Sequence, residues 1–265
     1  MNKKSFLFAF VGLFFSVNGV FAEKVYKEIV IDGEKVNKWM EVDSITEYDQ
    51  QEREVHKKEK LCESYTEYKD NYVYITSKYD FDDGEIHENF ETRELNKRGD
   101  IIYQKSEKLP GHKVELEVWN EYNARNLHIH RMFVYYQKNG KKDSWETWFK
   151  YDENGNVISD SDGNYFQYEK NKLVHSKAAD SCEKWFSYDE NGQKKYEKNY
   201  GYTRRGTKYG TEEYWYEYNN KNDIVHKKYK IDLDGIEISN FYYTYDYEYY
   251  PNGKLKKKTT YSCRG

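Results

Sequence analysis

The chain has 265 residues, of which 34% are charged and 18% aromatic, with 30 Tyr, 16 Gly and only 2 Pro. This composition excludes a collagen and a proline-rich linker, and the balance of 43 basic against 47 acidic residues gives no polybasic signature for nucleic-acid binding. The length permits one or two domains.

Residues 1–22 have the pattern of a secretory signal peptide. Lys3 and Lys4 precede an apolar stretch from Phe6 to Phe15, and small residues stand at the positions that define cleavage after Ala22. The apolar stretch is too short for a comfortable transmembrane helix. We therefore expect no membrane span after cleavage, and an exported protein that is periplasmic, on the cell surface or secreted.

The mature chain is poor in aliphatic residues, which on composition alone resembles a disordered chain. The aromatic residues oppose that reading, because each Tyr or Trp can bury on the order of 150–250 Å² while keeping a polar group at the ring edge. We expect a sheet with tyrosine-lined faces. Residues 23–110 are predicted to hold degenerate β repeats, and residues 111–265 a clearer repeat region that is continuous with them.

The pattern Glu-x-Trp-x-x-Tyr occurs four times within the clearer region. Its copies are Glu117, Trp119 and Tyr122; Glu146, Trp148 and Tyr151; Glu183, Trp185 and Tyr188; and Glu213, Trp215 and Tyr218. Spacing between such tyrosines predicts hairpin repeats of about 30 residues, each made of two strand-turn units of about 15 residues. In an extended strand the Glu and Trp share one face, and the Tyr points to the other.

Turn dipeptides separate these units, for example Asn154-Gly155 and Asn191-Gly192. The sequence therefore predicts an all-β fold, an antiparallel meander of roughly 12 to 16 strands. Only the charged stretch from Thr46 to Lys60 offers a helical alternative. The sheet could be an open single layer or could curl so that one face lines an interior. A transmembrane barrel is disfavoured because both faces carry charges and the mean hydropathy is −1.16.

Three short segments carry a family resemblance. The stretch from Tyr151 to Gly155, Tyr-Asp-Glu-Asn-Gly, resembles the core of bacterial YD repeats of Rhs-type proteins, and Tyr188 to Gly192 repeats it. The stretch from Tyr249 to Lys256 resembles MORN-variant repeats of bacterial proteins often labelled antitoxin-like. The resemblance covers mainly residues 117–261. It implies a repeat scaffold and says little about function.

The sequence contains few candidates for chemistry, so we expect no enzyme, no catalytic residues, no metal and no cofactor. His128 and His130 would share a face and could chelate a metal with a third ligand, but histidine recurs at one repeat position, which favours a structural role. Three cysteines allow one disulfide and three pairings. Pairing of Cys182 with Cys263 is slightly favoured.

The repeated Glu and Trp residues are the candidate binding residues. They are Glu117, Glu146, Glu183, Glu213, Trp119, Trp148, Trp185 and Trp215. If these residues are exposed, the rings could stack on sugars while the carboxylates bind hydroxyl groups; if they are buried, they are core residues of a repeat. We predict an exported, non-enzymatic scaffold that binds a protein or a surface. A glycan-binding module and an antitoxin-like or immunity protein for an exported toxin are the alternatives.

Overall fold

A computed structural model describes residues 24–31, 34–80, 86–179, 182–202, 208–233 and 235–264. The signal peptide prediction lies outside the described residues. The described residues form 19 β-strands, which confirms the all-β prediction. The strands are β1 (Lys24–Ile31), β2 (Glu34–Tyr48), β3 (Glu54–Glu59), β4 (Cys62–Lys69), β5 (Tyr72–Asp80), β6 (Ile86–Leu95), β7 (Ile101–Leu109), β8 (Lys113–Tyr122), β9 (His128–Tyr136), β10 (Lys142–Tyr151), β11 (Val157–Asp160), β12 (Tyr165–Glu169), β13 (Lys172–Lys177), β14 (Cys182–Tyr188), β15 (Lys194–Tyr202), β16 (Lys208–Tyr218), β17 (Ile224–Leu233), β18 (Ile236–Tyr249) and β19 (Leu255–Arg264). Nowhere in these ranges is there a helix long and apolar enough to cross a membrane.

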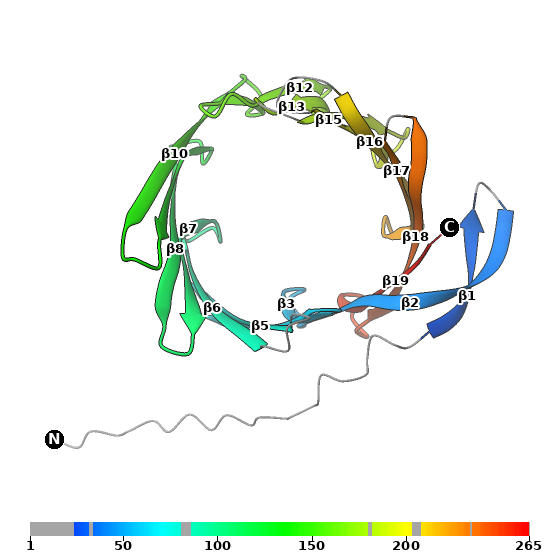
Figure 1. Ribbon diagram of the computed structural model, residues 1–265, viewed down its shortest axis with the longest axis horizontal. Helices are drawn as coiled ribbons and strands as arrows, with labels where there is room; N and C mark the ends of the chain where they lie inside the picture. Colours follow the sequence, from blue (N-terminus) through cyan, green and yellow to red (C-terminus); the bar gives the residue numbers. More distant parts are fainter. Residues whose placement is uncertain are drawn as a thin grey trace, which may run out of the picture.

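The sheet closes into a barrel. Each strand pairs antiparallel with the next, and β19 returns to pair with β2, from Lys257 opposite Glu47 to Ser262 opposite Glu41. Figure 1 shows the resulting ring, in which β2 to β19 form an 18-strand wall. The expected open or curled sheet is therefore wrong. Closure pairs the edge of β19 that an open meander would leave with free N–H and C=O groups, while β1 keeps one edge that is unpaired in the described residues.

The barrel has more strands than the sequence predicted, because several strands are short. Strands β11 and β12 have only 4 and 5 residues. The turn between β12 and β13 consists of Lys170 and Asn171, both with positive φ (48° and 60°). Positive φ at two successive residues is the geometry of a tight hairpin turn that usually contains glycine. Since this turn lacks glycine, the sequence pattern did not reveal it. The charged stretch that offered a helical alternative forms the end of β2, a turn and β3.

The Asn-Gly dipeptides do lie in hairpin turns, as predicted. After β10, the amide of Gly155 donates to the carbonyl of Asp152, and the amide of Asp152 donates to the carbonyl of Asn156. Gly155 has φ of +87°, a conformation that costs a residue with a side chain about 1 kcal/mol or more. Asp152 also accepts a hydrogen bond from the amide of Asn156 through its side chain, which holds the five-residue turn together.

A β-bulge accompanies three of these Asn-Gly turns, whereas β9 and β10 pair without a register shift around Asn139-Gly140. In the pair β10 and β11, Lys150 lies opposite Ser159 but Tyr151 lies opposite Val157, so Ile158 is an extra residue. The same shift precedes the last residue of the first strand in seven hairpins, at Tyr48, Leu95, Tyr122, Tyr151, Tyr188, Tyr218 and Tyr249, and it precedes the second-last residue of β12, Tyr168. Bulges increase local twist and bend the strand, which favours closure of a large sheet.

The hairpin of β1 and β2 shows which face of the wall is outside. Figure 1 places this hairpin outside the ring, beside β18 and β19. Its residues Ile29 (2% exposed) and Met40 (0%) pack on Tyr242, and Lys27 Nζ lies 2.6 Å from Asp246. The even-numbered residues at this part of β18 therefore face outward. The odd-numbered ones, such as Tyr245, face the lumen.

The hairpin also makes the barrel two layers thick at one place. Ile29, Met40 and Tyr242 form the buried apolar cluster of the described residues, with Val36 and Tyr261 packed against it. Elsewhere the wall is a single layer held by backbone hydrogen bonds and ring contacts. A ring of 18 strands about 4.8 Å apart has a radius of at least ~14 Å, which is too wide for side chains to fill.

Candidate functional site

The four predicted Glu and Trp pairs lie on the outer wall. Trp215 is opposite Lys228, and Lys228 is opposite Tyr242, which faces outward. Residues directly opposite in an antiparallel ladder share a face, and the same register leads around the wall to the other three copies. The motif tyrosines point inward, as the alternation predicted.

Each Glu and Trp pair encloses one aromatic ring from the preceding strand. In the copy on β14, the Trp185 ring stacks on His175 with centroids 4.1 Å apart. The Nε2 atom of the same His175 lies 2.8 Å from Oε1 of Glu183. Because Glu183 and Trp185 are two residues apart on one face, they contact the edge and the flat side of one imidazole.

The other three copies have the same arrangement with a Tyr or a His. Trp119 packs on Tyr103 (5.3 Å between centroids), whose hydroxyl donates to Glu117 at 2.6 Å. Trp215 packs on Tyr196 (5.5 Å), whose hydroxyl donates to Glu213 at 2.5 Å.

In the copy on β10, Trp148 stacks on His130 at 4.0 Å. His130 Nε2 lies 3.4 Å from Glu146 Oε2. His130 is 8% exposed, so the stacked indole and the wall leave little of this imidazole in contact with water. We name these four units the Glu-ring-Trp triads.

A fifth triad lies in the region where the sequence showed only degenerate repeats. Tyr65 on β4 stacks on His56 at 4.7 Å, and His56 Nε2 lies 3.0 Å from Glu63. Tyr65 therefore takes the place of the tryptophan. Glu63, Tyr65 and Tyr68 have the spacing of the Glu-x-Trp-x-x-Tyr motif, with Tyr at the position of the Trp.

The motif tyrosines have a structural role. The Tyr188 hydroxyl donates to the carbonyl of Leu173 at 2.8 Å, and that of Tyr218 donates to the carbonyl of Lys194 at 2.9 Å. Tyr122 and Tyr151 make the same bond to Ile101 and His128. Each hydroxyl thus satisfies a carbonyl near the start of the preceding strand, where the ladder begins.

In the triad on β16, hydrogen bonds lower the pKa of the Glu213 carboxyl group. Burial opposes ionisation of Glu213, but bonds from Tyr196 and Lys198 outweigh it and hold the pKa below its ordinary value. The pKa of Tyr196 is raised by burial and by the same bond. The carboxylate of this triad is therefore a permanent partner of the protein's own donors.

The structure brings each Trp to its Glu but does not align the four tryptophans. Trp119 lies opposite Met132, and Met132 lies opposite Glu146, so one copy's Trp is level with the next copy's Glu. Trp148 and Trp185 are 50% and 46% exposed, whereas the other two are half-buried. A continuous ladder of exposed indoles is not present on the outer wall.

Two further arrangements that the sequence left open are not formed. The bulge at Ile129 leaves His130 opposite Glu121 but His128 opposite Tyr122, so the two histidines face opposite sides. Cys182 and Cys263 are free and lie on β14 and β19, on the order of 20 Å apart across the intervening strands. A disulfide needs Cα atoms within about 7 Å. No group of three His, Cys, Asp or Glu in the described chain could hold a metal ion.

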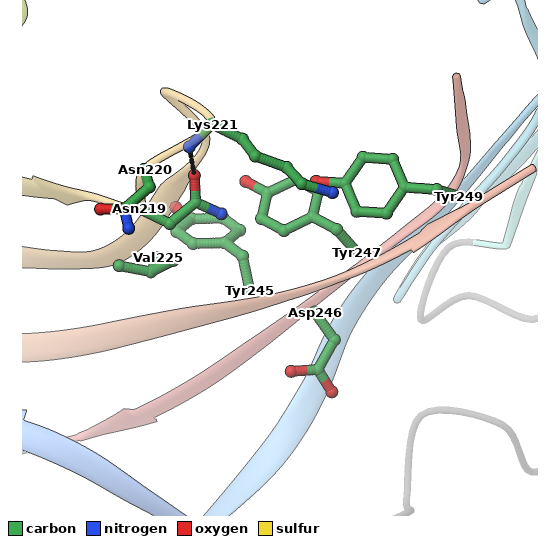
Figure 2. A pocket seen from close by; sticks show the side chains of 8 residues that line it. All are labelled: Asn219, Asn220, Lys221, Val225, Tyr245, Asp246, Tyr247 and Tyr249. Carbon is green, nitrogen blue, oxygen red and sulfur yellow. Dashed lines mark hydrogen bonds between the residues drawn. The ribbon is translucent and has the colours of Figure 1, made fainter. Parts of the chain in front are cut away.

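The structure reveals a pocket on the inner wall that the sequence did not indicate. It has a volume of about 620 Å³ and lies where the turn after β16 meets β17 and β18. Its lining residues are Asn219, Asn220, Lys221, Val225, Tyr245, Asp246, Tyr247 and Tyr249. Figure 2 shows the three tyrosines on the side of β18 that faces the turn, with Asp246 on the other side.

The pocket residues are held in place by local bonds. The Tyr247 hydroxyl donates to the carbonyl of Ile224 at 2.7 Å, and the Tyr249 hydroxyl donates to Asp223 at 2.6 Å. Burial and the bond to Asp223 raise the pKa of Tyr249 to about 12. Lys221 Nζ lies 3.9 Å from the centre of the Tyr249 ring. The pocket thus offers flat rings, amide groups and one cation to a ligand in the lumen.

Comparisons with known proteins give solved structures of low similarity and no family. No family model and no curated protein matches the chain. Among solved structures, it is similar to a porin-like protein from Bacteroides uniformis, with a TM-score of 0.35 and 8% identity over 91% of this chain and 96% of that one. It also matches a chain of the Photorhabdus luminescens Tc holotoxin pore, with a TM-score of 0.18 and 10% identity over 84% of this chain and 14% of that one. Similarity this low gives no information on the function of this protein.

Proposed function

We propose that the protein is an exported, non-enzymatic binding scaffold that takes its ligand on the inner wall of the barrel, between β16 and β19. The observation that supports this is the pocket of about 620 Å³ formed by tyrosine rings, two asparagines and Lys221. Concave aromatic pockets with a few polar groups are the usual form of ligand sites. The outer triads are a weaker candidate because their carboxylates already bind the protein's own rings.

The charged residues of the outer wall favour a barrel that is surrounded by water. Charged groups stand along it on several strands, among them Glu146 with 51% and Lys24 with 61% of the side chain exposed. The outer residues Glu47, Glu63 and Lys78 continue this charge on β2, β4 and β5. A barrel that spans a membrane needs an apolar band on this face. Fractionation of cells that express the chain is the test, and recovery only with detergent-extracted membranes would contradict the proposal.

Two matched variants test where binding occurs. The inner variant Lys221→Ala/Tyr245→Ala removes a cation and a ring from the pocket. The outer variant Trp148→Ala/Trp185→Ala removes the two exposed indoles. On an array of neutral and acidic glycans, we expect wild-type binding that the inner variant loses and the outer variant keeps. Loss only in the outer variant would favour the glycan ladder and overturn the inner-wall proposal.

Protein recognition is a second candidate, carried by the β1 and β2 hairpin. Strand β1 pairs only with β2 in the described residues, so one of its edges is free for strand addition. Tyr26 and Trp39 project from the outer side of this hairpin, 58% and 63% exposed, with ring centroids 5.2 Å apart. A pull-down from envelope extract that is unchanged by Tyr26→Ser/Trp39→Ser would remove this candidate.

A further inference from the structure

We infer that the inner wall between β16 and β19 binds an acidic saccharide, with sugar rings lying on the tyrosines and sugar carboxylates meeting Lys227 and Lys258. The inference rests on the proposed function and names the ligand class of the same wall. It extends the site from the pocket around Lys221 to the neighbouring strands.

Lys227 and Lys258 stand among tyrosine rings on the lumen side. Lys227 is directly opposite Tyr243, and its Nζ lies 4.8 Å from the Tyr214 ring centre and 5.2 Å from that of Tyr243. Lys258 is opposite Tyr247, and its Nζ lies 4.7 Å from the Tyr245 centre. Contact with ring faces favours a cation but does not neutralise it.

Neither ammonium has an ion-pair partner among the described residues. The acidic groups whose charge acts on them are Glu197 and Asp43 for Lys227, and Asp223 for Lys258. Glu197 binds Lys194 at 2.6 Å, and Asp223 binds the Tyr249 hydroxyl. These two carboxylates are thus already engaged.

The pKa shifts of Asp43 and of the two lysines also favour an anionic ligand. Burial and the charge of Glu59 raise the pKa of Asp43, which weakens it as a counter-ion. Burial lowers the pKa of both Lys227 and Lys258. A bound anion would relieve this cost, since an opposite charge nearby stabilises the protonated amine. The wall is therefore complementary in charge to an anionic ligand.

The chemistry of the remaining surface favours a saccharide over other anions. The apolar C–H faces of a sugar ring fit flat rings such as Tyr245 and Tyr243, and the amide of Asn220 can bind hydroxyl groups. Single-stranded nucleic acid also uses aromatic and basic surfaces, but it requires a basic domain, and this chain has a net charge of −4. We therefore assign the wall to acidic sugars.

The test compares two probes with the same sugar chain, one charged and one neutral. They are an oligogalacturonate of defined length and its fully methyl-esterified form, each measured by titration calorimetry with the full mature chain at low and moderate salt. We expect the acid to bind at least about tenfold more tightly than the ester. Lys227→Gln/Lys258→Gln should remove that difference, whereas Lys150→Gln/Lys177→Gln, which changes two exposed lysines on the outer wall, should keep it. Circular dichroism checks that each variant is folded.

The outcomes separate the two proposals. If acid and ester bind equally and Lys221→Ala/Tyr245→Ala weakens both, the inner wall binds sugars but the charge inference is wrong. If the acid binds and no inner variant weakens it, both proposals are wrong. No binding of the acid at millimolar concentration, or tighter binding of an oligothymidylate of equal charge, also overturns the inference. Added salt should weaken the binding of the acid and leave the binding of the ester unchanged.

Discussion

Met40→Ala should destabilise the seam where the barrel closes. Met40 is fully buried between Ile29 and Tyr242, in the cluster that joins the β1 and β2 hairpin to β18 and β19. Truncation of a buried Met to Ala costs about 2–5 kcal/mol, from lost apolar contact and from the cavity that remains. The hairpin and the pairing of β2 with β19 share this cluster, so both should loosen.

The matched control is Met132→Ala. Met132 lies on the outer face of β9, opposite Trp119, where the wall is a single layer and the side chain is half-buried. The same chemical change should therefore cost about 1 kcal/mol or less there.

Guanidinium denaturation followed by tryptophan fluorescence and circular dichroism gives the change in the free energy of unfolding. Hydrogen exchange should show faster exchange in β1, β2 and β19 of Met40→Ala only. Equal destabilisation by the two variants, or loss of protection spread evenly around the barrel, would refute the reasoning that the seam depends on this cluster.

Three further outcomes test the wall. Tyr188→Phe removes the bond to the Leu173 carbonyl and should lower the free energy of unfolding by about 0.5–1.5 kcal/mol; an unchanged denaturation midpoint would contradict the structural role of the motif tyrosine. Because the folded pKa of Glu213 is lowered, its contribution to stability is present above the unfolded value near 4.5 and is lost as pH falls through the folded value. Glu213→Gln should therefore reduce the loss of unfolding free energy at acid pH. Plots of unfolding free energy against pH that are parallel for the variant and the wild type would refute this. Burial and the bond to Glu63 raise the pKa of Tyr65 to about 12, so its share of stability is present below pH 10 and is lost as pH rises toward 12; tyrosinate absorbance that is complete near pH 10 in the folded protein would contradict it.

Some of the site could be predicted from residues alone. Alternation in Glu-x-Trp-x-x-Tyr placed Glu183 and Trp185 on one face and Tyr188 on the other, because strand parity is a local property. The ring between Glu183 and Trp185 could not be predicted, since His175 belongs to the preceding strand and its position depends on register. Register in turn depends on bulges, such as the one at Ile129, and on how two separate strands pair.

The amino-acid sequence by itself determined that the chain forms antiparallel strands with glycine-marked turns, because turn geometry and side-chain alternation act over a few residues. Only the tertiary structure decided that β19 meets β2, which face becomes the lumen, and that Lys227 and Lys258 gather among tyrosines from separate strands. Closure depends on the twist and shear summed over 18 strands, and on the hairpin that covers the seam. Twist and shear accumulate over the whole wall, so no short segment of the sequence determines them.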